Sequence, residues 1–309
     1  MSRQITLACA PCCWGVDDVK NPHLPPWEQV LDEAAAAGFG GLELGPYGYM
    51  PLDVARVGKA LRTRGLSLVA GTIFDNLVAA SNTDNLVQQT RDICTLITAL
   101  PKPLSHSGQR YDAPFLTVMD WGHDQRDYAA GHSKRAVRLN DADWATMIRN
   151  IRTISTLARD EFGVRAVIHP HAGGHIEFAD EISRLMNDID SDTAGLCLDT
   201  GHMVYSGMDP IETLRTYWDR VDYIHFKDIN SAVYARIMTE DIRFFDACAQ
   251  GVMCPIGTGQ IDYAALYSFL IDKGYSGYIT LEQERDPRNT GSILDDLKAS
   301  RSFLTDTGF

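Results

Sequence analysis

The feature that most constrains the fold is a regular alternation of short apolar runs with longer helical stretches along the whole chain. Eight runs rich in β-branched or other apolar residues predict strands: Ile5–Ala10, Gly41–Leu44, Leu66–Thr72, Phe115–Met119, Val164–His169, Ala194–Asp199, Val221–Phe226 and Gly277–Leu281. The stretches that follow them predict helices: Trp27–Ala37, Leu52–Arg64, Leu86–Leu100, Ala142–Phe162, Phe178–Asp188, Pro210–Trp218, Tyr263–Lys273 and Ser292–Leu304. Strands that alternate with helices in this way favour a parallel sheet.

The number of units and the lack of an internal boundary favour closure of that sheet into a barrel. The 309-residue chain has no Pro/Gly/Ser-rich linker and no low-complexity tract. An open, doubly wound sheet is the competing fold, but no G-x-G-x-x-G motif follows an early strand. The sequence therefore predicts an α/β protein with one (β/α)₈ (TIM) barrel domain over residues 1–309.

Two segments, of which the first is polar, are longer than a plain connector between a strand and a helix. They are Trp121–Leu139 and the stretch that begins near Ser231 and ends near Met253. Long loops in compact domains tend to be functional, so the first is expected to be a lid or a subunit contact. His123 and His132 are expected to be exposed loop histidines.

Composition and charge limit the classes of partner. The hydrophobic fraction is 45%, the charged fraction 22% and the formal net charge −13. An acidic surface disfavours polyanions, so nucleic acid is not expected as a partner. No apolar stretch reaches the length of a membrane span, and the seven cysteines lie mostly in apolar runs. These observations favour reduced thiols and a cytoplasmic protein without a membrane partner.

Charged and imidazole side chains follow several of the predicted strands, where a barrel carries its active site. Strands five, six, seven and eight lead into His169, Asp199, His225 and Glu282. A single His or Asp at a strand end is more often hydrogen-bonded to a neighbouring loop. Four at successive strand ends favour a divalent metal site instead, with Mn²⁺ or Co²⁺ expected and Mg²⁺ or Zn²⁺ as alternatives.

Further polar residues near these strand ends are candidates for proton transfer and substrate binding. Expected catalytic residues are Glu43, His171, His202 and Lys227. Lys227 and His202 have structural alternatives, in which Lys227 only pairs with Asp228 and His202 only orients Asp199. Residues expected to contact the substrate are Trp14, His175 and Glu177, and packing at the barrel mouth is the alternative for Trp14.

Two short motifs have weaker functional interpretations. Cys12 and Cys13, with Cys9, come close to a metal spacing but lack a second cysteine pair, so pocket-lining or packed thiols are favoured over a zinc site. The Gly257-Thr258-Gly259 motif resembles a phosphate-binding loop only weakly, and a plain turn is favoured.

Several motifs together resemble the xylose-isomerase-like TIM barrel superfamily, and within it the inosose (2-keto-myo-inositol) dehydratases. The segments that carry the resemblance are Leu42-Glu43-Leu44-Gly45, His169-Pro170-His171-Ala172-Gly173, Leu198-Asp199-Thr200-Gly201-His202, Ile224-His225-Phe226-Lys227-Asp228 and Gly257-Thr258-Gly259-Gln260-Ile261-Asp262, together with the opening Ala10-Pro11 and Trp14-Gly15. The resemblance implies metal ligands at His169, Asp199, His225 and Glu282. Many superfamily members have Glu in place of His169, so His171 is the alternative ligand from strand five.

The resemblance implies a metal-dependent lyase that dehydrates a keto-polyol, or eliminates from a 3-keto sugar, through an enolate. A ketose isomerase or 3-epimerase is the alternative, because both reactions share the enolisation step. A multi-metal nuclease is disfavoured by the net charge of −13. A non-catalytic sugar-binding protein is disfavoured because all four strand-end ligands remain. Related barrels often pair, so a homodimer or homotetramer is expected.

Overall fold

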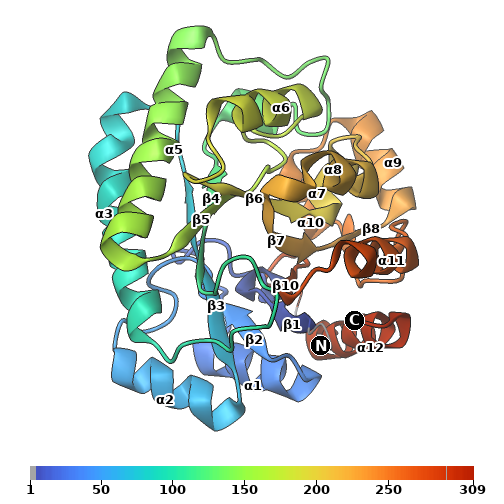
Figure 1. Ribbon diagram of the computed structural model, residues 1–309. Helices are drawn as coiled ribbons and strands as arrows, with labels where there is room; N and C mark the ends of the chain where they lie inside the picture. Colours follow the sequence, from blue (N-terminus) through green and yellow to red (C-terminus); the bar gives the residue numbers. More distant parts are fainter. Residues whose placement is uncertain (1–4, 290) are drawn as a thin grey trace.

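Eight parallel strands form a closed barrel in the computed structural model, which describes residues 5–289 and 291–309 (Figure 1). They are β1 (Ile5–Cys9), β2 (Gly41–Glu43), β3 (Ser67–Asp75), β4 (Phe115–Asp120), β5 (Arg165–Ile168), β6 (Gly195–Asp199), β7 (Val221–Phe226) and β10 (Gly277–Leu281). Around the barrel the order is β1-β10-β7-β6-β5-β4-β3-β2, so the first and last strands pair and close it. The prediction of a (β/α)₈ barrel is confirmed.

Helices surround the barrel and cover its outer face (Figure 1). Those that follow a barrel strand are α1 (Trp27–Ala37), α2 (Val54–Arg64), α3 (Thr83–Ala99), α5 (Asp141–Phe162), α6 (Ala179–Asp188), α8 (Pro210–Tyr217), α11 (Tyr263–Lys273) and α12 (Ile293–Thr307). Gly38 (φ 85°) and Gly65 (φ 68°) end α1 and α2 in the left-handed conformation that glycine adopts without strain.

Several elements lie in segments that the sequence pattern left irregular. The segment Trp121–Leu139 contains α4 (Asp124–Asp127), and α7 (Thr200–Tyr205) follows β6 directly. Between β7 and α11 lie β8 (Asp228–Ile229), α9 (Ser231–Glu240), α10 (Phe244–Ala249) and β9 (Met253–Cys254). β8 and β9 pair as a small antiparallel sheet, which anchors the two helices beside the barrel mouth. α4, α7 and α10 have only four to six residues, and β8 and β9 two each, so a hydrophobic period cannot mark them.

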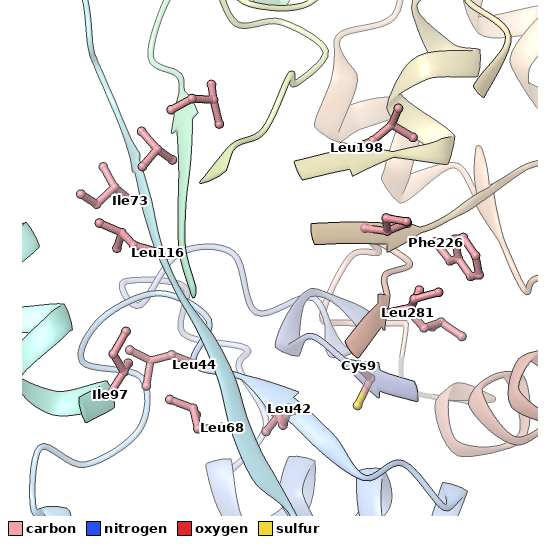
Figure 2. Packing of buried hydrophobic residues seen from close by; sticks show 14 of the residues in the cluster. Cys9, Leu42, Leu44, Leu68, Ile73, Ile97, Leu116, Leu198, Phe226 and Leu281 are labelled. Atoms are coloured by element: carbon pink, nitrogen blue, oxygen red, sulfur yellow. The ribbon is translucent and has the colours of Figure 1, made fainter. Parts of the chain in front are cut away.

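The largest hydrophobic cluster lies between the barrel strands and the surrounding helices. Figure 2 shows Leu42, Leu68, Ile73 and Leu116 on the outward faces of their strands, with Ile97 of α3 among them. A second set fills the barrel interior: Ala8, Val69, Ala70, Phe115, Val167, Cys197, Tyr223 and Tyr278. Side chains alternate between the two faces of a strand, so each strand contributes to both layers. In the described part of the chain, no helix is long and apolar enough to cross a bilayer.

Candidate active site

The alternation along the strands turns the four predicted metal ligands into the barrel. Asp199 is two residues beyond Cys197, and His225 two beyond Tyr223, so each shares the inward face of its strand. By the same count His169 follows Val167, and Glu282 lies just beyond β10. One ligand atom from each of His169, Asp199, His225 and Glu282 lies within 4.8 Å of the other three. The quartet therefore converges as the sequence predicted.

The close spacing of these groups leaves polar atoms without protein partners. His225 Nδ1 lies 3.0 Å from Glu282 Oε2, and His169 Nε2 lies 3.6 Å from Asp199 Oδ2. Within residues 5–289 and 291–309, both ring nitrogens of His169 and Oδ2 of Asp199 make no hydrogen bond. Buried polar atoms normally have a partner. Two imidazoles and two carboxylates that face one another, with unpartnered atoms on both imidazoles and on Asp199, fit a divalent metal ion.

Lys227 lies beside this quartet and is completely buried. Its Nζ lies 3.3 Å from Asp199 Oδ2 and 3.2 Å from Glu282 Oε2, and it also contacts Glu284. Burial alone would lower the pKa of Lys227, but Asp199, Glu284 and Glu282 raise it well above its usual value. Lys227 is therefore a fixed positive charge against the carboxylates of the site.

Asp228 does not pair with Lys227, which excludes the structural alternative considered from the sequence. Its carboxylate accepts the backbone N–H groups of Gly257, Gly259 and Ile261 at 3.0–3.2 Å. The Gly257-Thr258-Gly259 motif is thus a turn bound to Asp228, because its N–H groups at Gly257 and Gly259 are already occupied.

Glu43 contacts a predicted ligand. Its Oε1 accepts a hydrogen bond from the Tyr223 hydroxyl at 2.8 Å and lies 2.9 Å from His225 Nε2. When one imidazole nitrogen binds a metal and the other donates its N–H to a carboxylate, the carboxylate orients the ring and increases its basicity. Glu43 also lines the cavity described below, but its contacts indicate that Glu43 positions the ring of His225.

His171 and His202 lie face to face beside the quartet, with ring centroids 4.1 Å apart. His171 Nδ1 lies 2.9 Å from the carbonyl oxygen of Ala172 and must donate to it, so Nε2 carries the lone pair. Burial, His169 and Lys227 lower the pKa of His171 well below its usual value. The ring is therefore neutral and able to accept a proton.

His202 has a close polar neighbour at each ring nitrogen. Its Nδ1 accepts the N–H of Ala172 at 3.1 Å, and its Nε2 lies 3.1 Å from Lys227 Nζ. The backbone N–H of His202, not its side chain, donates to Asp199 Oδ1 at 2.8 Å. Burial and Lys227 lower the pKa of His202 well below its usual value.

A cavity of about 390 Å³ opens at this end of the barrel. Glu43, His171 and Glu282 line it, as does Cys12, one of the two thiols expected to line the pocket or to pack. Residues that the sequence analysis did not select line it as well: Asp17, Tyr47, Asn85, Gln89, Phe245 and Glu284. Burial raises the pKa of Glu284 to about 7, although Lys227 opposes this shift. Glu284 follows Glu282 by two residues, and that spacing was the available signal for it.

The structure places the three residues expected at the substrate elsewhere. Trp14 packs in the hydrophobic core and donates its Nε1–H to Glu33 at 2.6 Å. Glu177 accepts the N–H of Gly131 at 2.7 Å and lies 3.3 Å from the guanidinium of Arg126. These contacts tie the segment 121–139 to the loop after β5, and they give Glu177 a structural role.

The two remaining loop histidines have different environments. His123 is not the exposed residue expected, because its side chain is 13% exposed and its Nε2 lies 3.0 Å from Asp120 Oδ1. The third expected substrate residue, His175, packs against it, with ring centroids 4.4 Å apart. His132 is partly exposed and lies 3.6 Å from Asp241.

Comparison with known proteins agrees with this architecture. The family model described as "Xylose isomerase-like TIM barrel" matches residues 31–306. The chain belongs to this family. Along its full length it is similar to the inosose dehydratase of Clostridium perfringens, with 28% identity over 305 residues and 97% of each chain covered. The resemblance seen in the sequence motifs is confirmed, and the protein is an enzyme of this barrel family.

Two solved structures share the fold at low sequence identity. The probable 3-DHS dehydratase AsbF of Bacillus anthracis superposes with a TM-score of 0.70 at 16% identity, covering 97% of this chain and 98% of that one. The IOLI protein, whose structure contains a zinc atom, has a TM-score of 0.70 at 13% identity, covering 98% and 97%.

Proposed function

We propose that the protein is a metal-dependent lyase that removes water from a keto-polyol such as 2-keto-myo-inositol. The observation that carries this proposal is the quartet of His169, Asp199, His225 and Glu282, which meets the substrate-sized cavity at Glu282. Within the described residues, both imidazoles and Asp199 have buried polar atoms that make no hydrogen bond. The full-length relatives named inosose dehydratase support the same reaction.

A divalent metal in this quartet supplies Lewis acidity toward a carbonyl oxygen. The neutral His171 lines the cavity with Nε2 unprotonated, so it accepts the proton from the carbon next to the carbonyl. Glu43 is less suited to this step, because Tyr223 and His225 already occupy its Oε1.

Departure of the β-hydroxyl needs a proton, and Glu284 is positioned to provide it. Glu284 lines the cavity, and its pKa of about 7 leaves a substantial protonated fraction near neutral pH. The C–H proton goes to His171, the C–O bond breaks, and the proton of Glu284 converts the leaving hydroxyl to water. The buried ammonium of Lys227 stabilises the carboxylate that Glu284 then becomes.

The cavity lining favours an uncharged, hydroxyl-rich substrate. No Lys or Arg is among the described residues that line it, so a phosphate or carboxylate group would lack a cation. Asp75 Oδ2 accepts the amide N–H groups of Asn85 and Gln89 at 3.0 and 2.6 Å. This leaves the amide oxygens of the two side chains as acceptors for hydroxyl groups.

A ketose isomerase or 3-epimerase is the second candidate. It is favoured by one observation: two groups able to exchange protons, His171 and Glu284, line the same cavity. An epimerase needs this arrangement to remove a proton on one face of the substrate and return one on the other. The full-length relatives favour the lyase over this alternative.

The test follows product formation by metal-stripped protein and by protein reloaded with Mn²⁺, Co²⁺ or Zn²⁺, using 2-keto-myo-inositol as substrate. Metal-dependent growth of the ultraviolet absorbance of a conjugated product is the result expected for the lyase. Incorporation of solvent deuterium into the substrate without such absorbance would favour the isomerase or epimerase.

A further inference from the structure

A second group of metal-ligand side chains lies outside the main cavity, at the carboxyl end of β4. Asp120 is the last residue of β4, His123 immediately precedes α4, and His175 lies in the loop between β5 and α6. One ligand atom from each lies within 4.8 Å of the other two. This group shares no residue with the quartet of the candidate active site.

Asp120 holds the group together. Its carboxylate is buried, and Oδ1 accepts the N–H of Leu77 at 3.0 Å while lying 3.0 Å from His123 Nε2. Its other oxygen, Oδ2, accepts the backbone N–H of His175 at 2.8 Å. The carboxylate is therefore fixed from two sides, next to both imidazole rings.

His175 has a polar atom that these hydrogen bonds do not explain. The residue is only 8% exposed, and its Nδ1 has no hydrogen-bond partner within residues 5–289 and 291–309. Burial lowers the pKa of His175 to about 4, despite the nearby charge of Asp120, so the ring is neutral and keeps a free lone pair. Leaving a buried polar atom without a partner is unfavourable, so a ligand at this position is favoured.

We propose that Asp120, His123 and His175 form a second metal site, which takes Zn²⁺ or a similar imidazole-binding transition metal. Two imidazoles and one carboxylate are a common ligand set for such ions, with the fourth position left to water. The partly exposed His123 gives the ion a route from solvent. The bound metal would fasten the segment 121–139 to the loop that carries both His171 and His175.

Metal stoichiometry of the full-length protein tests this inference. Chelator-treated protein is dialysed against a slight excess of Zn²⁺, and bound metal is counted by mass spectrometry, with Co²⁺ absorption spectra as a second readout. The variants are His175→Phe, which keeps an aromatic ring but removes both nitrogens, and Asp199→Asn in the main site. His132→Phe is the matched control, because His132 lies in the same region outside the group.

The inference predicts two metal ions per chain in wild type and in His132→Phe, and one in each of His175→Phe and Asp199→Asn. Wild type and His175→Phe with equal stoichiometry would overturn it, whatever the main site binds. Loss of metal in His175→Phe but not in Asp199→Asn would support the second site while contradicting the main-site ligands. Circular dichroism of each variant identifies any loss of bound metal that results from unfolding.

Discussion

The ammonium nitrogen of Lys227 lies 3.3 Å from Oδ2 of Asp199, inside the group of candidate metal ligands. Both side chains are fully buried, and Lys227 contacts Glu282 and Glu284 as well. A second metal ion in this position would face the positive charge of Lys227. The main site is therefore suited to one metal ion, which argues against the multi-metal nuclease considered from the sequence.

Replacing Lys227 with Met should damage both folding and catalysis. The variant leaves Asp199, Glu282 and Glu284 without their common cation, and uncompensated buried charge costs about 3–5 kcal/mol. We expect a lower Tm, partly restored by added metal, and a loss of turnover of about 100-fold or more. Lys298→Met, at an exposed position, is the control. A folded Lys227→Met enzyme with wild-type turnover would exclude this role.

Asp199→Asn should lose metal and activity together. The substitution keeps the shape of the side chain and the acceptor for the N–H of His202, but it removes a charged oxygen from the quartet. Replacing a residue that only hydrogen-bonds to a metal ligand lowers metal affinity or activity by roughly 10–100-fold. Replacing the ligand itself should lower them by more. Metal content, counted beside turnover, checks this, and Asp219→Asn at an exposed site is the control. Full metal content with normal turnover would contradict the ligand assignment.

Asn85→Ala and Gln89→Ala should raise KM more than they lower kcat. Each removes an acceptor for a substrate hydroxyl, and one hydrogen bond of about 1 kcal/mol corresponds to roughly a fivefold change in affinity. Gln88→Ala, which alters the exposed neighbour of Gln89 on α3, should leave both constants unchanged. If Asn85→Ala and Gln89→Ala behave like this control, the two amides do not bind substrate.

Loading the main site with metal should release protons. Burial alone lowers the pKa of His225, but Cys197, Glu282 and Glu43 raise it well above its usual value, so the metal-free ring is protonated at neutral pH. A metal ligand must be deprotonated, so its affinity should rise with pH across the neutral range. Titration of chelated protein with Zn²⁺ in weak buffer containing a pH dye measures this release. Affinity independent of pH would contradict a charged His225.

The barrel and the main quartet were predictable because they depend on strong, periodic signals. Each strand is a buried apolar run, and the inward face of His169, Asp199 and His225 follows from counting by two. α1, with its apolar stripe and Gly38, was predicted with its observed bounds. These features are local in sequence, and the barrel then places them at one end.

The rest of the site depends on contacts between distant segments, which no local pattern contains. Asn85 and Gln89 face the cavity because Asp75, at the end of β3, binds their amides. Phe245 reaches the cavity from α10, a helix of six residues that is too short for a periodic pattern to mark. Trp14 was expected near substrate from its position after β1, but its hydrogen bond to Glu33 turns it into the core.

Arg126→Met should destabilise the fold without changing the metal site directly. Arg126 is fully buried and lies 2.7 Å from Glu181 and 3.3 Å from Glu177. Its removal leaves the buried Glu177 without this cation and leaves Glu181 with only Arg138, 3.4 Å away. We expect a loss of about 3–5 kcal/mol in the free energy of unfolding. Arg91→Met removes the exposed pair with Glu161, which water screens, and should change the free energy of unfolding far less. Urea denaturation of both variants measures the difference, and equal losses would show that the buried network contributes no more than a surface pair.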